Sequence, residues 1–214
     1  MRTALDKKDV EILGIDTPFK GFKRIDRYRL RHRLFSGGWG QEIEREVFEC
    51  GHGVVVVPFD PVLDKVVLVE QFRHGKLAAL SSPWFDDSAS PWTLECVAGN
   101  IAENEQPEDV AKRELMEEAG CSLSELVPVG QFLLNPGGSS HSVYIFCARI
   151  DASSVGGIHG VEGEGEDIRV FTETTEDVFE MIYSGKISGA GSVIGLQWLN
   201  LNKEKLCNRW LGKK

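Results

Sequence analysis

Three glutamates crowd one face of a predicted helix near the middle of this 214-residue chain. Residues Pro107–Ala119 are predicted to be helical because a proline suits the first helical position and a glycine follows the end. Glu114, Glu117 and Glu118 are spaced i, i+3 and i+4, so they lie within one turn of one face. Such like charges repel by roughly 0.2–0.5 kcal/mol per pair, and a bound cation would remove that cost. The pattern predicts a site for Mg²⁺ or Mn²⁺, although an acidic, solvated helix face is the alternative.

Residues around this helix fit the same chemistry. Arg113 lies four residues before Glu117 and can pair with it, which would orient that carboxylate. Further along, residues 156–165 hold five glycines and are expected to form a mobile loop. A solvated loop is one interpretation, and a lid that brings a catalytic base to the metal is the other. The acids in and beside this loop are Glu162, Glu164 and Glu166.

The amino-acid composition excludes several classes of protein. Lys and Arg number 24 and Asp and Glu 33, and the net charge of −9 argues against a nucleic-acid module. Five cysteines, an odd number without a C-x-x-C pair, indicate a reducing compartment rather than disulfides or zinc. The charged start has no apolar signal segment, and no apolar run is long enough to span a bilayer. We expect a cytoplasmic protein that binds neither membrane nor nucleic acid.

The charge is unevenly distributed along the chain. Residues 1–52 hold 11 basic and 9 acidic residues, whereas residues 53–214 hold 13 and 24. This shift predicts a small N-terminal β domain over 1–52 and a larger domain over 53–214. Residues 74–93 are expected to be a long loop, and loops of this length in compact domains are commonly either functional or disordered.

Short elements are predicted on both sides of the acidic helix. The N-terminal domain is expected to be a three-stranded antiparallel sheet, too small to be stable alone. Its expected strands are Val10–Gly14, Phe22–Leu34 and Gln41–Phe48. In the larger domain the expected strands are Val54–Asp60, Lys65–Phe72, Leu126–Phe132, Ser142–Ala148 and Ile168–Glu173, and the expected helices are Val178–Ser184, Ser192–Asn200 and Lys203–Trp210.

The acidic helix lies within a longer motif. The chain from 99 to 120 fits G-x5-E-x7-R-E-U-x-E-E-x-G, in which U is apolar and is Leu115. The residues at the other fixed positions are Gly99, Glu105, Arg113, Glu114, Glu117, Glu118 and Gly120. This stretch resembles the box of the Nudix hydrolase family, with Cys121 unusual at the last apolar position.

The resemblance implies a fold, a metal site and a reaction. The implied fold is α/β, a mixed β-sheet sandwiched between helices, and the implied substrates are nucleoside diphosphates linked to another group. Glu114 and Glu118 would be the primary ligands of Mg²⁺, with Glu117 as a third, catalytic carboxylate oriented by Arg113. The carbonyl of Ala98 would add a further ligand. In the loop, Glu166 would be a ligand and Glu164 the catalytic base, with Glu162 as the alternative base.

Features outside the box resemble the ADP-ribose pyrophosphatase members of the family. Pro136 lies 15 residues after Cys121, a spacing that marks that subfamily. The resemblance implies that Arg73 and Arg45 contact phosphate or ribose and that Phe22 stacks on adenine. The resemblance likewise implies that Asn135, where a serine is common, is a further substrate contact. Residues 73–91 are longer than the subfamily pattern.

The implied activity is Mg²⁺-dependent hydrolysis of ADP-ribose to AMP and ribose 5-phosphate. The implied assembly is a homodimer formed through the N-terminal domain. The same hydrolysis of another nucleoside diphosphate sugar or of NADH is the enzymatic alternative. A non-catalytic ADP-ribose sensor is the alternative from another class, and it would be expected to lack some of these carboxylates. The histidines have no metal-ligand spacing and receive no role.

Overall fold

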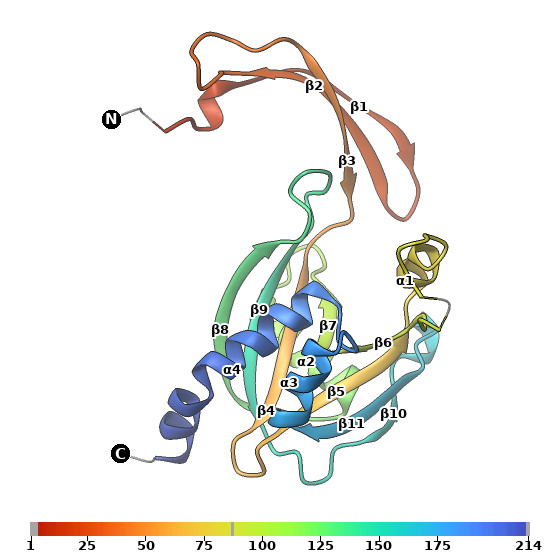
Figure 1. The fold of residues 1–214 in the computed structure, drawn as a ribbon, viewed down its shortest axis with the longest axis vertical. Coiled ribbons are helices and arrows are strands. Elements are labelled where there is room, and N and C mark those ends of the chain that lie inside the picture. Colours follow the sequence, from red (N-terminus) through yellow and green to blue (C-terminus); the bar gives the residue numbers. More distant parts are fainter. Residues whose placement is uncertain (1–3, 87, 213–214) are drawn as a thin grey trace. The chain divides into compact units, whose positions relative to one another are not determined.

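The computed structural model describes residues 4–86 and 88–212. The chain divides into two compact units (Figure 1). The first comprises the described residues up to Gly51 together with Leu133–Ser142, and the second comprises His52–Phe132 and the described chain from Val143 onward. In the described part of the chain, no helix is both long and apolar enough to cross a membrane.

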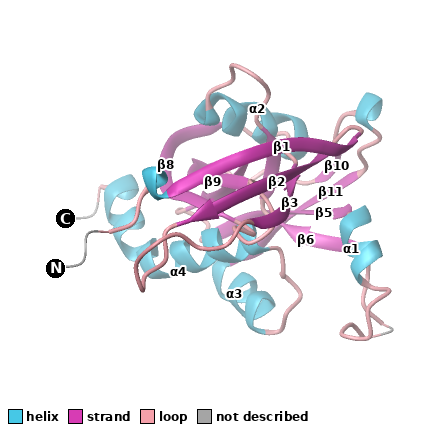
Figure 2. Cartoon of the chain, turned by 90° about the horizontal axis from the view of Figure 1, so that it is seen from above, coloured by secondary structure: helices cyan, strands magenta, loops and turns pink. Residues whose placement is uncertain are grey.

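The first unit contains a three-stranded antiparallel sheet in the order β1-β2-β3, which confirms the predicted architecture (Figure 2). A 3-10 helix at Lys7–Asp9 precedes β1 (Val10–Lys20), β2 (Arg24–His32) and β3 (Ile43–Glu49). Strand β1 is longer than predicted because β-bulges between Ile12 and Gly14 and between Asp16 and Phe19 let this edge strand accommodate a glycine and a proline. Phe22 lies in the turn after β1, not in a strand.

The second unit is built on an eight-stranded mixed sheet. Its strands are β4 (Gly53–Asp60), β5 (Lys65–Phe72), β6 (Trp92–Glu95), β7 (Val97–Asn100), β8 (Leu123–Leu133), β9 (Ser142–Ile150), β10 (Gly157–His159) and β11 (Ile168–Thr174). Strand β4 pairs in parallel with β9 along one edge. Along its other edge, β4 pairs first with β7 and then, at its end, with β5. The sheet therefore forks beside β4, and β7 lies in the fork.

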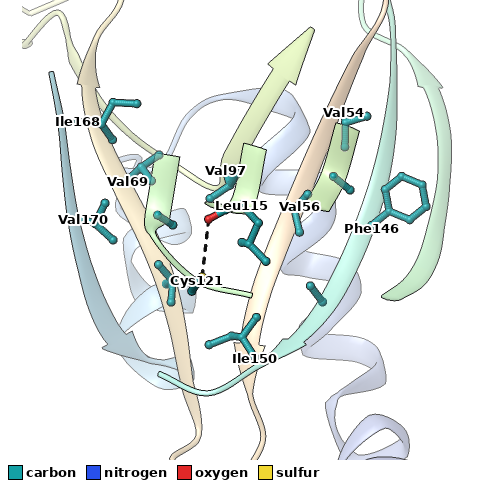
Figure 3. Packing of buried hydrophobic residues seen from close by; sticks show 14 of the residues in the cluster. Val54, Val56, Val69, Val97, Leu115, Cys121, Phe146, Ile150, Ile168 and Val170 are labelled. Carbon is teal, nitrogen blue, oxygen red and sulfur yellow. Dashed lines mark hydrogen bonds between the residues drawn. The ribbon is translucent and has the colours of Figure 1, made fainter. Parts of the chain in front are cut away.

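Helices cover both faces of this sheet. Successive residues of β4 point to opposite faces, so Val54 and Val56 belong to one core and Val55 and Val57 to another. Helix α2 (Pro107–Ala119) packs on the first core, part of which Figure 3 shows. Helices α3 (Thr175–Tyr183) and α4 (Ala190–Leu211) pack on the second. This mixed sheet between helices confirms the predicted fold class.

Several predicted elements were wrong in extent. Residues 74–93 are not all loop, because they contain helix α1 (His74–Ala79) and the start of β6. The glycine-rich segment 156–165 contains β10 and a 3-10 helix at Glu162–Glu164. The two helices expected in the C-terminal region are one continuous helix, α4, since no proline or glycine interrupts 196–211. Strands β6 and β7, of four residues each, were not predicted.

Candidate active site

Helix α2 presents its acidic face because an adjoining face is fixed in the core. Ala111, Leu115 and Ala119 are at most 1% exposed, as their i, i+4, i+8 spacing predicts. Gly120 ends the helix in the left-handed conformation, with φ of 62°, and its N–H bonds to the carbonyl of Met116. The orientation of the three glutamates therefore follows from packing of the adjoining apolar residues.

Glu118 is the most deeply buried carboxylate of α2. Glu118 as a whole is only 2% exposed to solvent. Oε2 accepts a hydrogen bond from the backbone N of Ala98 at 2.9 Å, and Oε1 accepts one from Nε2 of Gln71 at 3.3 Å. Burial raises the pKa of the Glu118 carboxyl to about 7, and these two donors only partly oppose the effect. The protein therefore holds a carboxylate where its charge is poorly solvated, which a cation would correct.

Glu114 packs against the backbone of Gly99. A Cβ added to Gly99 would lie 1.8 Å from Oε1 and 2.3 Å from Cγ of Glu114, so only glycine leaves room for this side chain. Burial also raises the pKa of the Glu114 carboxyl to about 7, and Arg113 partly opposes the rise. The glycine that opens the motif thus has a steric function: it lets the carboxylate lie against strand β7.

Arg113 connects three carboxylates. Its Nη1 donates to Oε1 of Glu114 at 2.8 Å and to Oε2 of Glu117 at 2.9 Å, which confirms the predicted pairing with Glu117. Its Nε donates to Oε1 of Glu105 at 3.3 Å. Glu105 in turn accepts the N–H of Ala102 at 2.8 Å, so the loop before α2 is tied to the helix. Arg113 therefore orients the acidic face of α2 and partly neutralises it.

Arg73 is held by an ion pair at the end of β5. Its Nε and Nη2 donate to Oε2 of Glu95 at 3.0 and 2.6 Å, while Oε1 of Glu95 accepts from Oγ1 of Thr93 at 2.8 Å. The backbone N of Arg73 also bonds to the carbonyl of Pro91 at 3.0 Å. The ion pair uses one edge of the guanidinium group, so the other edge is available to bind an anion.

A single cavity of about 220 Å³ in the second unit brings most of these groups together. Of the loop acids, Glu164 and Glu166 line this cavity. Oε2 of Glu166 accepts a hydrogen bond from the backbone N–H of Val161 at 3.0 Å. The residues that line the cavity are Arg73, Ala98, Gly99, Asn100, Arg113, Glu114, Glu117, Glu118, Val161, Glu164 and Glu166. The cavity therefore contains eight of the residues predicted from the sequence, and Glu162 does not line it.

The backbone of Ala98 also faces this cavity. In a strand, the N–H and C=O of one residue point to the same side. The N–H of Ala98 bonds to Glu118 instead of to β4, so its carbonyl oxygen points toward the carboxylates as well. This orientation is the one required for the predicted carbonyl ligand.

The donor set fits a divalent cation. Carboxylate and carbonyl oxygens are the hard ligands that Mg²⁺ and Mn²⁺ prefer, and a cation would offset the desolvation of Glu114 and Glu118. Within residues 4–86 and 88–212, no three acidic, histidine or cysteine side chains are already arranged to hold an ion. Because Arg113 bonds to Glu114 and Glu117, binding would require these contacts to rearrange.

Three predicted substrate contacts lie in the first unit, outside this cavity. Phe22 is 95% exposed, with Nζ of Lys23 5.0 Å from its ring centroid. Nη1 of Arg45 donates to the carbonyl of Glu44, and Asn135 is exposed in the loop after β8. None of the three is among the residues that line the cavity of the second unit, and their roles stay predictions.

Sequence reasoning missed two groups beside the cavity, Gln71 and Glu95. Both act through another side chain: Gln71 bonds to Glu118, and Glu95 bonds to Arg73. Gln71 lies in β5 and Glu95 ends β6, and their places beside the cavity become visible only once the pairing of β5 with β6 is known, since neither spacing nor composition marks them.

Comparison with known proteins places the chain in a family. Residues 51–181, more than half of the chain, match the NUDIX domain model. The protein therefore belongs to the Nudix family and is a Nudix hydrolase. Members of its kind generally use a divalent metal.

Individual relatives cover most of the chain. The ADP-ribose pyrophosphatase of Escherichia coli (strain K12) is 48% identical over 95% of this chain and 94% of its own. That of Haemophilus influenzae is 39% identical over 95% and 92%. The GDP-mannose pyrophosphatase of Enterobacter sp. (strain 638) is 31% identical over 74% and 78%. A crystal structure of an ADP compounds hydrolase shares the fold, with a TM-score of 0.68 over 94% of this chain and 98% of that chain at 18% identity.

Proposed function

We propose that this protein hydrolyses the pyrophosphate bond of ADP-ribose to give AMP and ribose 5-phosphate, with Mg²⁺ or Mn²⁺ as cofactor. The observation that carries the proposal is the cavity that five glutamates from α2 and the 162–166 loop line together with Arg73. Such a site combines ligands for a cation with a donor for a phosphate.

The choice of substrate is supported by the relatives. Those named ADP-ribose pyrophosphatase match nearly the whole chain, whereas the one named GDP-mannose pyrophosphatase matches about three quarters of it at lower identity. ADP-ribose is therefore favoured over other nucleoside diphosphate sugars and NADH. A binding-only sensor is disfavoured because Glu117, Glu118 and the loop acids are all present.

Each residue has a defined task in this proposal. When bound, the divalent cation neutralises the pyrophosphate and acidifies the attacking water. Glu114, Glu118, Glu166 and the carbonyl of Ala98 would hold it, with Glu117 completing the set. The free edge of Arg73 binds a phosphate oxygen. Water adds to one phosphorus, its proton passes to a carboxylate, and the bond to the bridging oxygen breaks.

Glu164 is proposed as the base that takes this proton. It lines the cavity, and Glu162 of the same 3-10 helix does not. Glu164→Gln should therefore lower kcat by at least about 100-fold, the lower end of general-base effects. Glu162→Gln makes the same change of charge in the same loop and should retain kcat within about threefold. Equal losses in the two variants would reject Glu164 as the base.

We also propose that the protein forms a homodimer through its first unit. Of the residues in β1, β2 and β3, only Asp26 is buried, and large apolar side chains such as Ile12, Ile15 and Phe19 are 53–58% exposed. A sheet with this much exposed apolar surface is typical of an interface. Sedimentation of the wild type and of Ile15→Asp tests this, since a dimer built on this face should dissociate in the variant. The cytoplasmic location and the substrate contacts of the first unit stay predictions.

The first experiment is to incubate the protein with ADP-ribose and Mg²⁺ and to separate the products by chromatography. AMP should form, EDTA should abolish it, and Glu118→Gln should lower the rate by at least about 100-fold because a buried metal ligand is lost. Intact ADP-ribose that binds tightly would instead indicate the sensor, and intact ADP-ribose without binding would direct the search to other nucleotide sugars and NADH.

A further inference from the structure

The segment that carries Glu164 and Glu166 is fixed to helix α2 despite its glycines. The backbone N of Gly160 donates to the carbonyl of Glu117 at 3.3 Å. This carbonyl is in the last turn of α2, where carbonyl groups have no partner within the helix. One end of the loop therefore satisfies a backbone group of the helix that carries the other carboxylates.

The ring of His159 makes a second contact with the same helix end. A Cβ added to Gly120 would lie 2.4 Å from Cε1 of His159, so the ring occupies the space that glycine leaves. Nε2 of His159 lies 3.0 Å from the carbonyl oxygen of Gly156. A carbonyl only accepts, so Nε2 carries a proton and donates it, which fixes the orientation of the ring.

The contact continues from His159 to the loop acids. Strand β10 ends at His159, which pairs with Ile168 of β11, and Gly160 follows with φ of 107°. A Cβ at Gly160 would lie 2.8 Å from Cβ of Glu166, so the loop closes tightly on itself. The bond from Val161 N–H to the carboxylate of Glu166 then sets the direction of that side chain.

We propose that His159 is a positioning residue, whose ring, seated on Gly120, fixes the distance between the loop carboxylates and those of α2. The proposal rests on the proposed hydrolysis for its kinetic consequence, but the anchor itself is a property of the protein alone. Loss of the ring would leave the loop held to the helix by the backbone bond from Gly160 to Glu117 without the side-chain contact, and would remove no group from the cavity.

The test compares His159→Ala with Ile158→Ala, a control in the same short strand whose side chain is 67% exposed. Without metal or substrate, amides 160–166 should exchange hydrogen roughly tenfold faster in His159→Ala than in the wild type, the effect of about one lost hydrogen bond. Exchange in α4 should be unchanged, and Ile158→Ala should match the wild type. His159→Gln, which keeps an N–H donor, should partly restore slow exchange.

Kinetics provide the second measurement. His159→Ala should lower kcat by roughly 10–100-fold and raise the Mg²⁺ concentration for half-maximal rate, because displaced carboxylates cost rate steeply. KM for ADP-ribose should stay within about twofold, since Arg73 is not displaced. Unchanged exchange of 160–166 would overturn the proposal, as would a fall in activity explained by general loss of folding. If the wild type fails to hydrolyse ADP-ribose, the proposed function fails, and the exchange comparison still decides whether the anchor exists.

Discussion

Replacing Gly99 by alanine should displace Glu114 and disable the site without changing any group that does chemistry. The new methyl would lie 1.8 Å from Oε1, 1.9 Å from Cδ and 2.3 Å from Cγ of Glu114. Ordinary contact begins near 3.4 Å, so the carboxylate must retreat by roughly 1.5 Å. Because misplacement by about 1 Å can cost about 100-fold in rate, we expect kcat to fall at least 100-fold. Overpacking should also cost about 1–3 kcal/mol of stability.

The assay measures kcat, the half-saturating Mg²⁺ concentration and the melting temperature. Gly75→Ala is the matched control, because a Cβ there meets nothing within 4 Å. In a Glu114→Ala background the clash is absent, so adding Gly99→Ala should change neither rate nor stability appreciably. If Gly99→Ala keeps kcat within a factor of three, or is equally harmful when residue 114 is alanine, the steric explanation of this glycine is wrong.

Three further outcomes follow from the same contacts. The pKa of Glu118 is raised to about 7 from 4.5, so between these pH values the folded state holds a proton that the unfolded state has lost. In EDTA, stability should therefore fall as pH rises from 4.5 to 7. Because the pKa of Glu114 is raised in the same way, thermal melts of Glu118→Gln should keep part of this fall and should show one smaller than that of the wild type by on the order of 2 kcal/mol. Glu95→Gln should raise KM for ADP-ribose about tenfold with little change in melting temperature, because Arg73 loses its charged partner. Gly195→Ala, whose Cβ would lie 2.6 Å from Cγ2 of Val57, should lower stability by about 1–3 kcal/mol while kcat below the melting temperature is unchanged.

Each of these has a result that contradicts it. A melting temperature of Glu118→Gln that varies with pH as the wild type does would show that another group is responsible. An unchanged KM in Glu95→Gln would mean that Arg73 is oriented without the ion pair, or does not contact substrate. A Gly195→Ala variant as stable as the wild type would mean that α4 can shift away from β4 at no cost.

Helix α2 was predicted to its last residue because its signals are local. A proline at its start, a glycine at its end and an apolar stripe that packs into the core agree with one another, and the acidic face follows from the same period. The fold class was predicted from the resemblance of residues 99–120 to the Nudix box, and the apolar strands expected before α2, which are β4 and β5, agree with it.

The missed features depend on contacts between distant segments. Strands β6 and β7 are too short to show a period, and β7 exists because the fork beside β4 gives it a partner. The anchored loop after β10 has the composition of a mobile one, and contact with the end of α2 holds it. The steric reason for Gly99 likewise cannot be found along the chain, because it arises from a side chain 15 positions away.

The parallel pairing of β4 with β9 has a consequence for how quickly the protein becomes active. The register joins Gly53 to Val143, two residues separated by about 90 positions, and loop closure of that length slows the formation of such a pair. Strand β7 and helix α2 lie within the intervening segment and both contribute to the cavity. During refolding, α2 should gain helical structure early, whereas hydrolytic activity should return only in the slowest phase, when the central strands have joined.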